Sequence, residues 1–215
     1  MNRLEQELAE LKRRVLEMAT LAESMVTDSW YGVARRDAAC LGRVVANEPT
    51  LDRFQVEIDR EAVRLIAVFT PVARDLRFLL MIARITSELE RMGDHAVDNC
   101  EYARLIGDTP PTADLTTLSD FVQRMVHEAI KAFTDEDSRQ AEAVMQLDAR
   151  VDALYSEVFR DLLEHAPGDS RVRSTGLILF ARSLERIADH ASNVCEEIFY
   201  FVEGADIRHQ TAVNT

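Results

Sequence analysis

Two distant segments of the chain carry nearly the same twelve-residue sequence, and this repeat limits the fold more than any other feature. Residues 90–101 read ERMGDHAVDNCE and residues 185–196 read ERIADHASNVCE. Seven of the twelve positions are identical, including the Glu, Arg, Asp and His at matching offsets. Repetition on this scale indicates that one structural unit occurs twice. The sequence therefore predicts two copies of one unit, divided near residues 107–112.

Each unit is predicted to be helical throughout. Seven glycines and five prolines in 215 residues are too few for the frequent turns of an all-β protein. Apolar residues recur at alternating spacings of three and four, which is the pattern of a buried helix face. The pattern is complete in the last predicted helix: Leu177, Phe180, Leu184, Ile187, Ala191, Val194, Ile198 and Phe201. The predicted helices span residues 3–35, 38–67, 71–106, 113–133, 137–165 and 170–203.

These helices predict an all-α protein of two tandem, pseudo-symmetric three-helix bundles, in which six long antiparallel helices are joined by short loops. The first bundle is expected over residues 1–107 and the second over residues 112–204. Residues 205–215 are expected to form a flexible tail.

Proline and glycine mark the expected boundaries. Thr70-Pro71 is interpreted as the N-cap and first residue of the third helix. Pro49 is expected to kink or briefly break the second helix. Residues 107–111 read GDTPP and predict the main linker, and residues 167–170 predict a second break. Gly204 is expected to end the last helix.

Charge and cysteine content exclude several classes of protein. The formal net charge of −13 argues against a nucleic-acid partner, because phosphate binding needs a basic surface. No run of 18 apolar residues predicts membrane insertion, and residues 1–10 lack the apolar core of a signal peptide. Three cysteines form no disulfide framework and no CxxC zinc pair, and Cys100 and Cys195 are interpreted as small buried hydrophobic residues. We therefore expect a cytoplasmic protein.

Four pairs of carboxylates are spaced four residues apart, so each pair lies on one face of a helix. The pairs are Glu48/Asp52, Glu90/Asp94, Asp148/Asp152 and Glu185/Asp189. A single such pair would be ordinary solvated surface in a chain this acidic. The repeated-motif pairs, however, interrupt second apolar helix faces that are rich in small residues such as Gly93 and Ala188. Crowded carboxylates on such a surface lose hydration and repel one another, so a bound cation would stabilise them.

The residues around these pairs narrow the choice of cation. Ligands made only of oxygen favour hard cations such as Mg²⁺, Mn²⁺, Ca²⁺ and Fe³⁺. Arg91 and Arg186 follow the motif glutamates and could supply part of the neutralising charge. His95 and His190 lie one residue past the aspartates, about 100° around the helix. We expect a structural role for these histidines, with direct ligation as the alternative.

The doubled motif E-R-[IM]-[GA]-D-H-A-x-[ND], in which each copy closes a three-helix unit, resembles the PhoU family of phosphate-transport regulatory proteins. The segment Ala73–Arg77 after Pro71 also resembles that family. The resemblance covers nearly the whole chain, residues 3–204. It implies the two-bundle fold, a homodimer, and a cytoplasmic location at the periphery of membrane-protein partners.

The resemblance also implies a function and a set of ligands. PhoU proteins are negative regulators of phosphate uptake and of the phosphate-starvation response, and they link the phosphate ABC transporter to the sensor histidine kinase. Their acidic motifs bind metal ions, with iron or zinc expected first and manganese, magnesium or calcium as alternatives. Carried over to this chain, the ligands are Glu90, Asp94, Glu185 and Asp189, with Glu48, Asp52, Asp148 and Asp152 as facing contributors.

The chain departs from the repeat at two places near these ligands. Asp98 in the first copy stands where the second copy has Asn193. Pro49 follows Glu48, whereas Ala149 follows Asp148. Because proline disturbs a helix locally, we expect the better-formed metal site in the second repeat.

Two other functions compete with the metal-binding adaptor. A carboxylate-bridged di-iron oxidase needs Glu-x-x-His on two helices, and the chain contains no such spacing. No nucleophile–base pair or glycine-rich phosphate loop is present either, so we expect no enzyme activity. A metal-independent helical regulator or scaffold for a different transporter remains the alternative.

Overall fold

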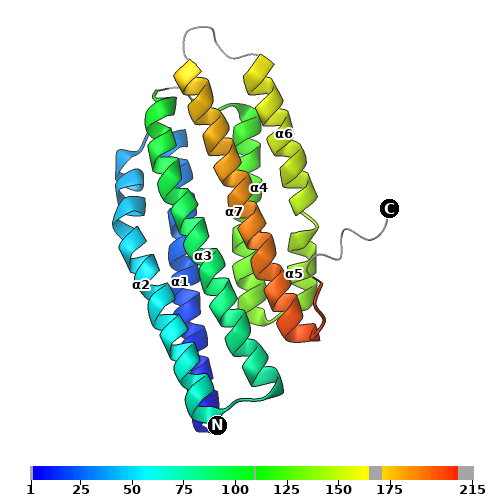
Figure 1. Ribbon diagram of the computed structural model, residues 1–215. Helices are drawn as coiled ribbons and strands as arrows, with labels where there is room; N and C mark the ends of the chain where they lie inside the picture. The colour runs from blue at the N-terminus through cyan, green and yellow to red at the C-terminus, as the bar shows by residue number, and fades with distance from the viewer. Residues whose placement is uncertain (1, 109, 165–170, 208–215) are drawn as a thin grey trace.

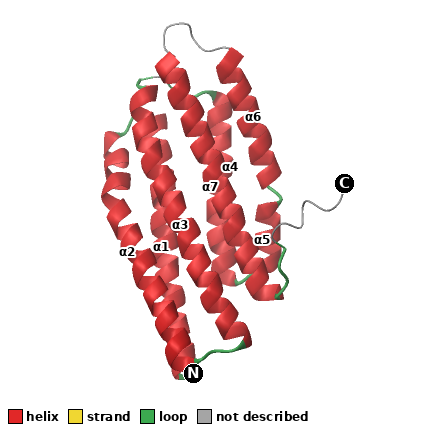
Figure 2. Ribbon diagram, in the orientation of Figure 1, coloured by secondary structure: helices red, strands yellow, loops and turns green. Residues whose placement is uncertain are grey.

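The computed structural model describes residues 2–108, 110–164 and 171–207, and every regular element among them is an α-helix (Figures 1 and 2). The all-α prediction is therefore confirmed. The helices are α1 (Arg3–Ala34), α2 (Ala38–Phe69), α3 (Ala73–Ile106), α4 (Ala113–Asp135), α5 (Ser138–Met145), α6 (Asp148–Glu164) and α7 (Arg171–Glu203). None of them combines the length and the apolar character that a bilayer span requires.

The two helices that carry the repeated motif, α3 and α7, lie side by side in the middle of the molecule (Figure 1). On one side α1 and α2 pack with α3, and on the other α4, α5 and α6 pack with α7. Figure 1 shows α2, α3, α7 and α6 in one layer, with α1 and α4 behind them. The arrangement confirms the predicted pair of bundles, although the residue limits 1–107 and 112–204 stay a prediction.

The predicted helix seams form the core. All eight seam residues of α7 are buried, from Leu177 at one end to Phe201 at the other. The core continues from one bundle into the other, because Trp30 of α1 contacts Phe180 of α7 and Phe78 of α3 contacts Phe201. The two bundles therefore share a single apolar interior.

The helix predicted over 137–165 is wrong in one respect, because the chain turns within it. The amide of Leu147 donates to the carbonyl of Val144 at 2.9 Å, a tight contact that ends α5. The amide of Val151 then donates to the carbonyl of Leu147 at 3.1 Å and begins α6. Val144 and Val151 are both buried, so the apolar pattern runs through the turn and conceals it. The end of this predicted helix and the break predicted at 167–170 lie outside the described residues.

Pro49 was expected to kink or briefly break the second helix, and the break is wrong. Residues Ala38–Phe69 form one uninterrupted helix with Pro49 inside it. Proline removes one hydrogen bond but leaves the rest of the ladder intact, and Figure 1 shows α2 bowing rather than stopping. Proline was expected to interrupt the helix of the first repeat. The helix is instead interrupted at the corresponding place in the second repeat, between α5 and α6.

Thr70-Pro71 does not begin α3 as predicted. Thr70 instead ends α2 in the left-handed conformation, with φ of 44°, and its amide donates to the carbonyl of Ile66 at 3.1 Å. Val72 occupies the N-cap position of α3 without a side-chain hydrogen bond. Gly107 and Gly204 follow the last residues of α3 and α7 with positive φ, and the predicted end of α7 is confirmed. Residues 208–215 of the predicted tail lie outside the described residues.

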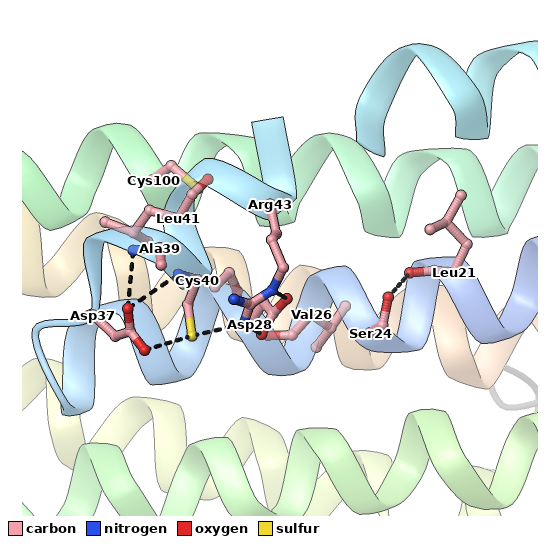
Figure 3. Close-up of polar contacts among 11 residues, drawn as sticks. Leu21, Ser24, Val26, Asp28, Asp37, Ala39, Cys40, Leu41, Arg43 and Cys100 are labelled. Atoms are coloured by element: carbon pink, nitrogen blue, oxygen red, sulfur yellow. Dashed lines mark hydrogen bonds and ion pairs between the residues drawn. The ribbon is translucent and has the colours of Figure 1, made fainter. Parts of the chain in front are cut away.

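Polar side chains fix the start of α2, as Figure 3 shows. Asp37 accepts hydrogen bonds from the amides of Ala39 and Cys40 and caps the helix. Arg43 donates to both carboxylate oxygens of Asp28 on α1, at 2.6 and 2.8 Å. The Arg43–Asp28 contact binds the beginning of α2 to α1.

All three cysteines lie in the described part of the chain, and all are free and buried. The Cys100 thiol faces the carbonyl of Leu41 at 3.8 Å. Burial raises the pKa of Cys100 to about 11 and also raises the pKa of Cys195. Buried thiols of this kind behave as small hydrophobic groups, which agrees with the interpretation of Cys100 and Cys195 from the sequence.

The close approach of the two bundles near Gly176 gives a stability prediction. A Cβ at Gly176 would lie 2.8 Å from the Cβ of Leu105 and 3.0 Å from the amide nitrogen of Ile106. Gly176→Ala should therefore lower the free energy of unfolding by about 1–3 kcal/mol, measured by urea denaturation. The control is Gly42→Ala, where nothing lies within 4 Å and alanine should add about 0.5–1 kcal/mol. A Gly176→Ala protein as stable as the original chain would contradict the packing described.

Candidate metal centre

The structure gathers six of the predicted ligands into two three-carboxylate clusters. Site one consists of Asp52, Glu90 and Asp94, and site two consists of Asp152, Glu185 and Asp189. In each cluster one carboxylate oxygen from every residue lies within 4.8 Å of the others. Two oxygens on one ion, each at about 2.1–2.5 Å, are separated by no more than about 5 Å. Each cluster therefore has the spacing of a single-ion site.

Each cluster joins a central helix to its outer neighbour. The repeated motif places a Glu and an Asp four residues apart, so both project from the same face of α3 or α7. The third carboxylate comes from the facing helix, with Asp52 on α2 and Asp152 on α6. In Figure 1 the outer helices α2 and α6 lie on opposite sides of the α3–α7 pair. The two sites thus follow the pseudo-symmetry of the repeat.

The remaining two predicted ligands, Glu48 and Asp148, fall outside these clusters among the described residues. Glu48 is half-buried one helical turn from Asp52. Asp148 is the first residue of α6, and its carboxyl group interacts with those of Asp189 and Asp152. Site two therefore has a fourth carboxyl group at its edge.

Crowding and burial disturb the ionisation of the cluster residues. Burial, followed by the charges of Asp94 and Asp52, raises the pKa of Glu90. Burial and the charge of Asp52 raise the pKa of Asp94 in the same way. In site two, burial raises the pKa values of Glu185 and Asp189, and the charge of Asp152 adds to both effects. The ionised carboxylates are thus destabilised where a cation would be most favourable.

Asp148 shows the largest effect in this region. Burial, together with the charges of Asp189 and Asp152, raises its pKa to about 6. A carboxyl group in the first turn of a helix would ordinarily be favoured in its charged form. For Asp148, the surrounding negative charge and the loss of hydration outweigh the stabilisation that the first turn of the helix gives to a carboxylate.

One oxygen of site two fits a metal ligand for a separate reason. Oε2 of Glu185 is buried and forms no hydrogen bond. A buried carboxylate oxygen without a donor is costly, by about 1–3 kcal/mol. The oxygen-only donor sets suit a hard cation, and such an ion would satisfy this atom. The residues present therefore fit a bound metal.

The histidines of the motif lie between the two bundles rather than in the clusters. The rings of His95 and His190 stack with their centroids 5.4 Å apart. Nδ1 of His190 lies 2.7 Å from Oε2 of Glu88, which also accepts a hydrogen bond from Asn193 at 3.0 Å. Burial, with the positive charge of His190, lowers the pKa of His95 to about 4. This geometry favours the predicted structural role for the histidines.

Sequence reasoning missed the polar contacts that join α3 and α7. Glu88 was not among the predicted residues, yet it holds His190. Its counterpart in the second repeat is Ser183, whose hydroxyl donates to the backbone carbonyl of His95 at 3.1 Å. Arg84 and Glu197 form a further ion pair across the two helices at 2.9 Å. Glu88 and Ser183 lie two residues before the repeated segments, where the two copies already differ, so the sequence repeat gave no signal for them.

The raised pKa of Asp148 predicts a pH-dependent stability. The pKa of an aspartate is near 4 in the unfolded chain and about 6 here, so the folded protein binds the proton more tightly. That stabilisation is present at low pH and is lost as the pH rises from about 4 to about 6. Asp148→Asn should therefore be more stable than the original chain near pH 7.5, by about 1 kcal/mol after allowance for solvent screening. Urea denaturation with a chelator present should show no such difference near pH 4, and an equal difference at both pH values would contradict the account.

Comparison with known proteins gives a consistent result. A family model described as the PhoU domain matches residues 15–103 and 115–198. A Caulobacter vibrioides protein named phosphate-specific transport system accessory protein PhoU homolog is 37% identical over 211 residues, 95% of this chain and 92% of that protein. The Escherichia coli K12 protein named phosphate-specific transport system accessory protein PhoU is 34% identical over 208 residues, 94% of this chain and 86% of that protein. The crystal structure of PhoU from Pseudomonas aeruginosa matches with a TM-score of 0.90 at 32% identity, covering 94% of this chain and 100% of that one.

Proposed function

The chain belongs to the PhoU family, and we propose that it is a metal-binding accessory protein that restrains phosphate uptake and the phosphate-starvation response. The names of its relatives in Caulobacter and Escherichia coli support the link to phosphate-specific transport. The observation that carries the metal-binding part is the pair of three-carboxylate clusters at equivalent places in the two repeats. No chemical step is proposed at either cluster.

In this proposal the metal ions act on the outer helices. Asp52 would hold an ion together with Glu90 and Asp94, and Asp152 would do so with Glu185 and Asp189. The ions supply the positive charge that offsets carboxylate repulsion. The resemblance to the PhoU family puts iron or zinc first, and the oxygen-only donor sets suit iron as well as the alternatives manganese, magnesium and calcium. Because each site joins an outer helix to a central one, metal occupancy would tighten α2 against α3 and α6 against α7.

The proposed partners are the phosphate ABC transporter and the sensor histidine kinase of the phosphate response. The protein would work as a homodimer in the cytoplasm, at the periphery of these membrane proteins. Binding energy, rather than catalysis, would carry the signal between them. The helix faces beside the metal sites would then change with metal occupancy and could report it to a partner.

The metal sites are tested by removing one ligand from each. Asp94→Ala combined with Asp189→Ala should abolish bound metal while the helical circular dichroism is kept, because Asp94 is exposed, Asp189 is half-buried and neither belongs to the apolar core. Metal content is measured by plasma mass spectrometry on purified, tag-free protein. The control is Asp120→Ala with Asp135→Ala, which removes the same charge from exposed positions on α4. Unchanged metal content in the first variant would reject the sites.

The regulatory role is tested in a cell. Deleting the gene should raise phosphatase expression in phosphate-rich medium, because a repressor of the starvation response is then missing. A phosphatase assay measures the effect, and a plasmid copy of the gene should reverse it. Normal repression in the deletion strain would instead favour a helical regulator of a different transporter.

A further inference from the structure

The two copies of the motif place an arginine after the cluster glutamate, but the two arginines behave differently. In site two, Nη1 of Arg186 lies 3.4 Å from Oδ2 of Asp189, and Nε lies 3.7 Å from Oε2 of Glu185. One guanidinium group therefore spans two of the three carboxylates of that site. In site one, Arg91 is exposed and forms no ion pair or hydrogen bond with another described residue. The charge of Arg91 still acts on Glu90, but only Arg186 forms ion pairs with the carboxylates of its own site.

The contacts of Arg186 with the two carboxylates are weak. Its side chain is 47% exposed, and only the contact with Asp189 qualifies as a hydrogen bond. Oε2 of Glu185, the buried oxygen without a hydrogen bond, has the Arg186 guanidinium at 3.7 Å as its ion-pair partner. Exposed ion pairs at such distances are weak, so a divalent ion bound to the same oxygens would displace the arginine.

We propose that Arg186 is the resident counter-cation of site two, which neutralises Glu185 and Asp189 in the metal-free protein and is displaced when a metal ion binds there. The inference rests on the proposed metal-binding function and adds a regulating residue to it. Metal binding at site two is then an exchange of one cation for another, and the released guanidinium joins the surface where α6 packs against α7. Site one has no such exchange, because Arg91 does not occupy it.

A neighbouring arginine separates this role from a general effect of charge. Arg182 lies one helical turn before Arg186, and its charge also acts on Glu185 and Asp189. Arg182 is exposed, and no described residue forms an ion pair with it. Arg182→Gln therefore removes the same charge from the same neighbourhood without removing a contact.

The test measures Mn²⁺ binding to one site at a time, by the loss of the free-ion signal in electron paramagnetic resonance. Asp94→Asn leaves site two as the only intact cluster, and Arg186→Gln or Arg182→Gln is added to it. A salt concentration of about 0.15 M limits the reach of distant charges to about 8 Å. Arg186→Gln should tighten Mn²⁺ binding about fivefold, the equivalent of one exposed ion pair, and Arg182→Gln less than about twofold. Arg186→Lys keeps the charge but not the planar guanidinium group. It should tighten Mn²⁺ binding by an amount between the effects of the two glutamine variants.

Site one supplies the matched control. Asp189→Asn leaves only that cluster, and adding Arg91→Gln should change Mn²⁺ affinity by less than about twofold. Equal tightening by Arg186→Gln and Arg182→Gln would overturn the role of Arg186 while leaving the metal sites intact. Absence of Mn²⁺ binding in every variant and in the unaltered chain would overturn the proposed metal-binding function itself, and this inference with it.

Discussion

The packing of α3 against α7 determines where the other parts of the molecule lie. Both helices present an apolar seam to the interior, and their mutual packing is the most extensive contact between the bundles. The remaining helices cover what this pair leaves exposed, with α1 and α4 behind and α2 and α6 at the sides (Figure 1). Since the repeated motif lies on both central helices, the same packing also places the two acidic clusters on opposite sides of the α3–α7 pair.

The clusters depend on a balance between hydration and repulsion. A helix face that is partly apolar reduces the hydration of Glu90 or Glu185, and the neighbouring carboxylates add like charge. Such an arrangement is unfavourable unless a cation is present, so a nearby positive charge stabilises the ionised carboxylates. In the second repeat Arg186 forms ion pairs with two of the carboxylates, whereas in the first repeat the charge of Arg91 acts on Glu90 without an ion-pair contact.

Much of the fold followed from the sequence because periodic signals are local and strong. The seam from Leu177 to Phe201, the doubled motif and the pairing of Glu90 with Asp94 all depend on helical spacing alone, and the structure agrees with them. The turn at Leu147 was missed since buried Val144 and Val151 preserve the apolar spacing across it. Pro49 does not break α2 because the rest of a long, well-packed helix tolerates one missing hydrogen bond. The choice between Glu48 and Asp52, or between Asp148 and Asp152, depended on how two helices face each other, and no spacing within one helix contains that information.

The mismatch of Glu88 and Ser183 has a consequence for how such a molecule can vary. If the two repeats were separate, identical chains, a contact across their common axis would have to occur twice, and any substitution would appear on both sides. Joining the halves in one polypeptide removes that restriction. Glu88 can then contact a histidine side chain while Ser183 donates a hydrogen bond to a backbone carbonyl. The covalent link therefore allows each half to specialise while the shape they share is preserved.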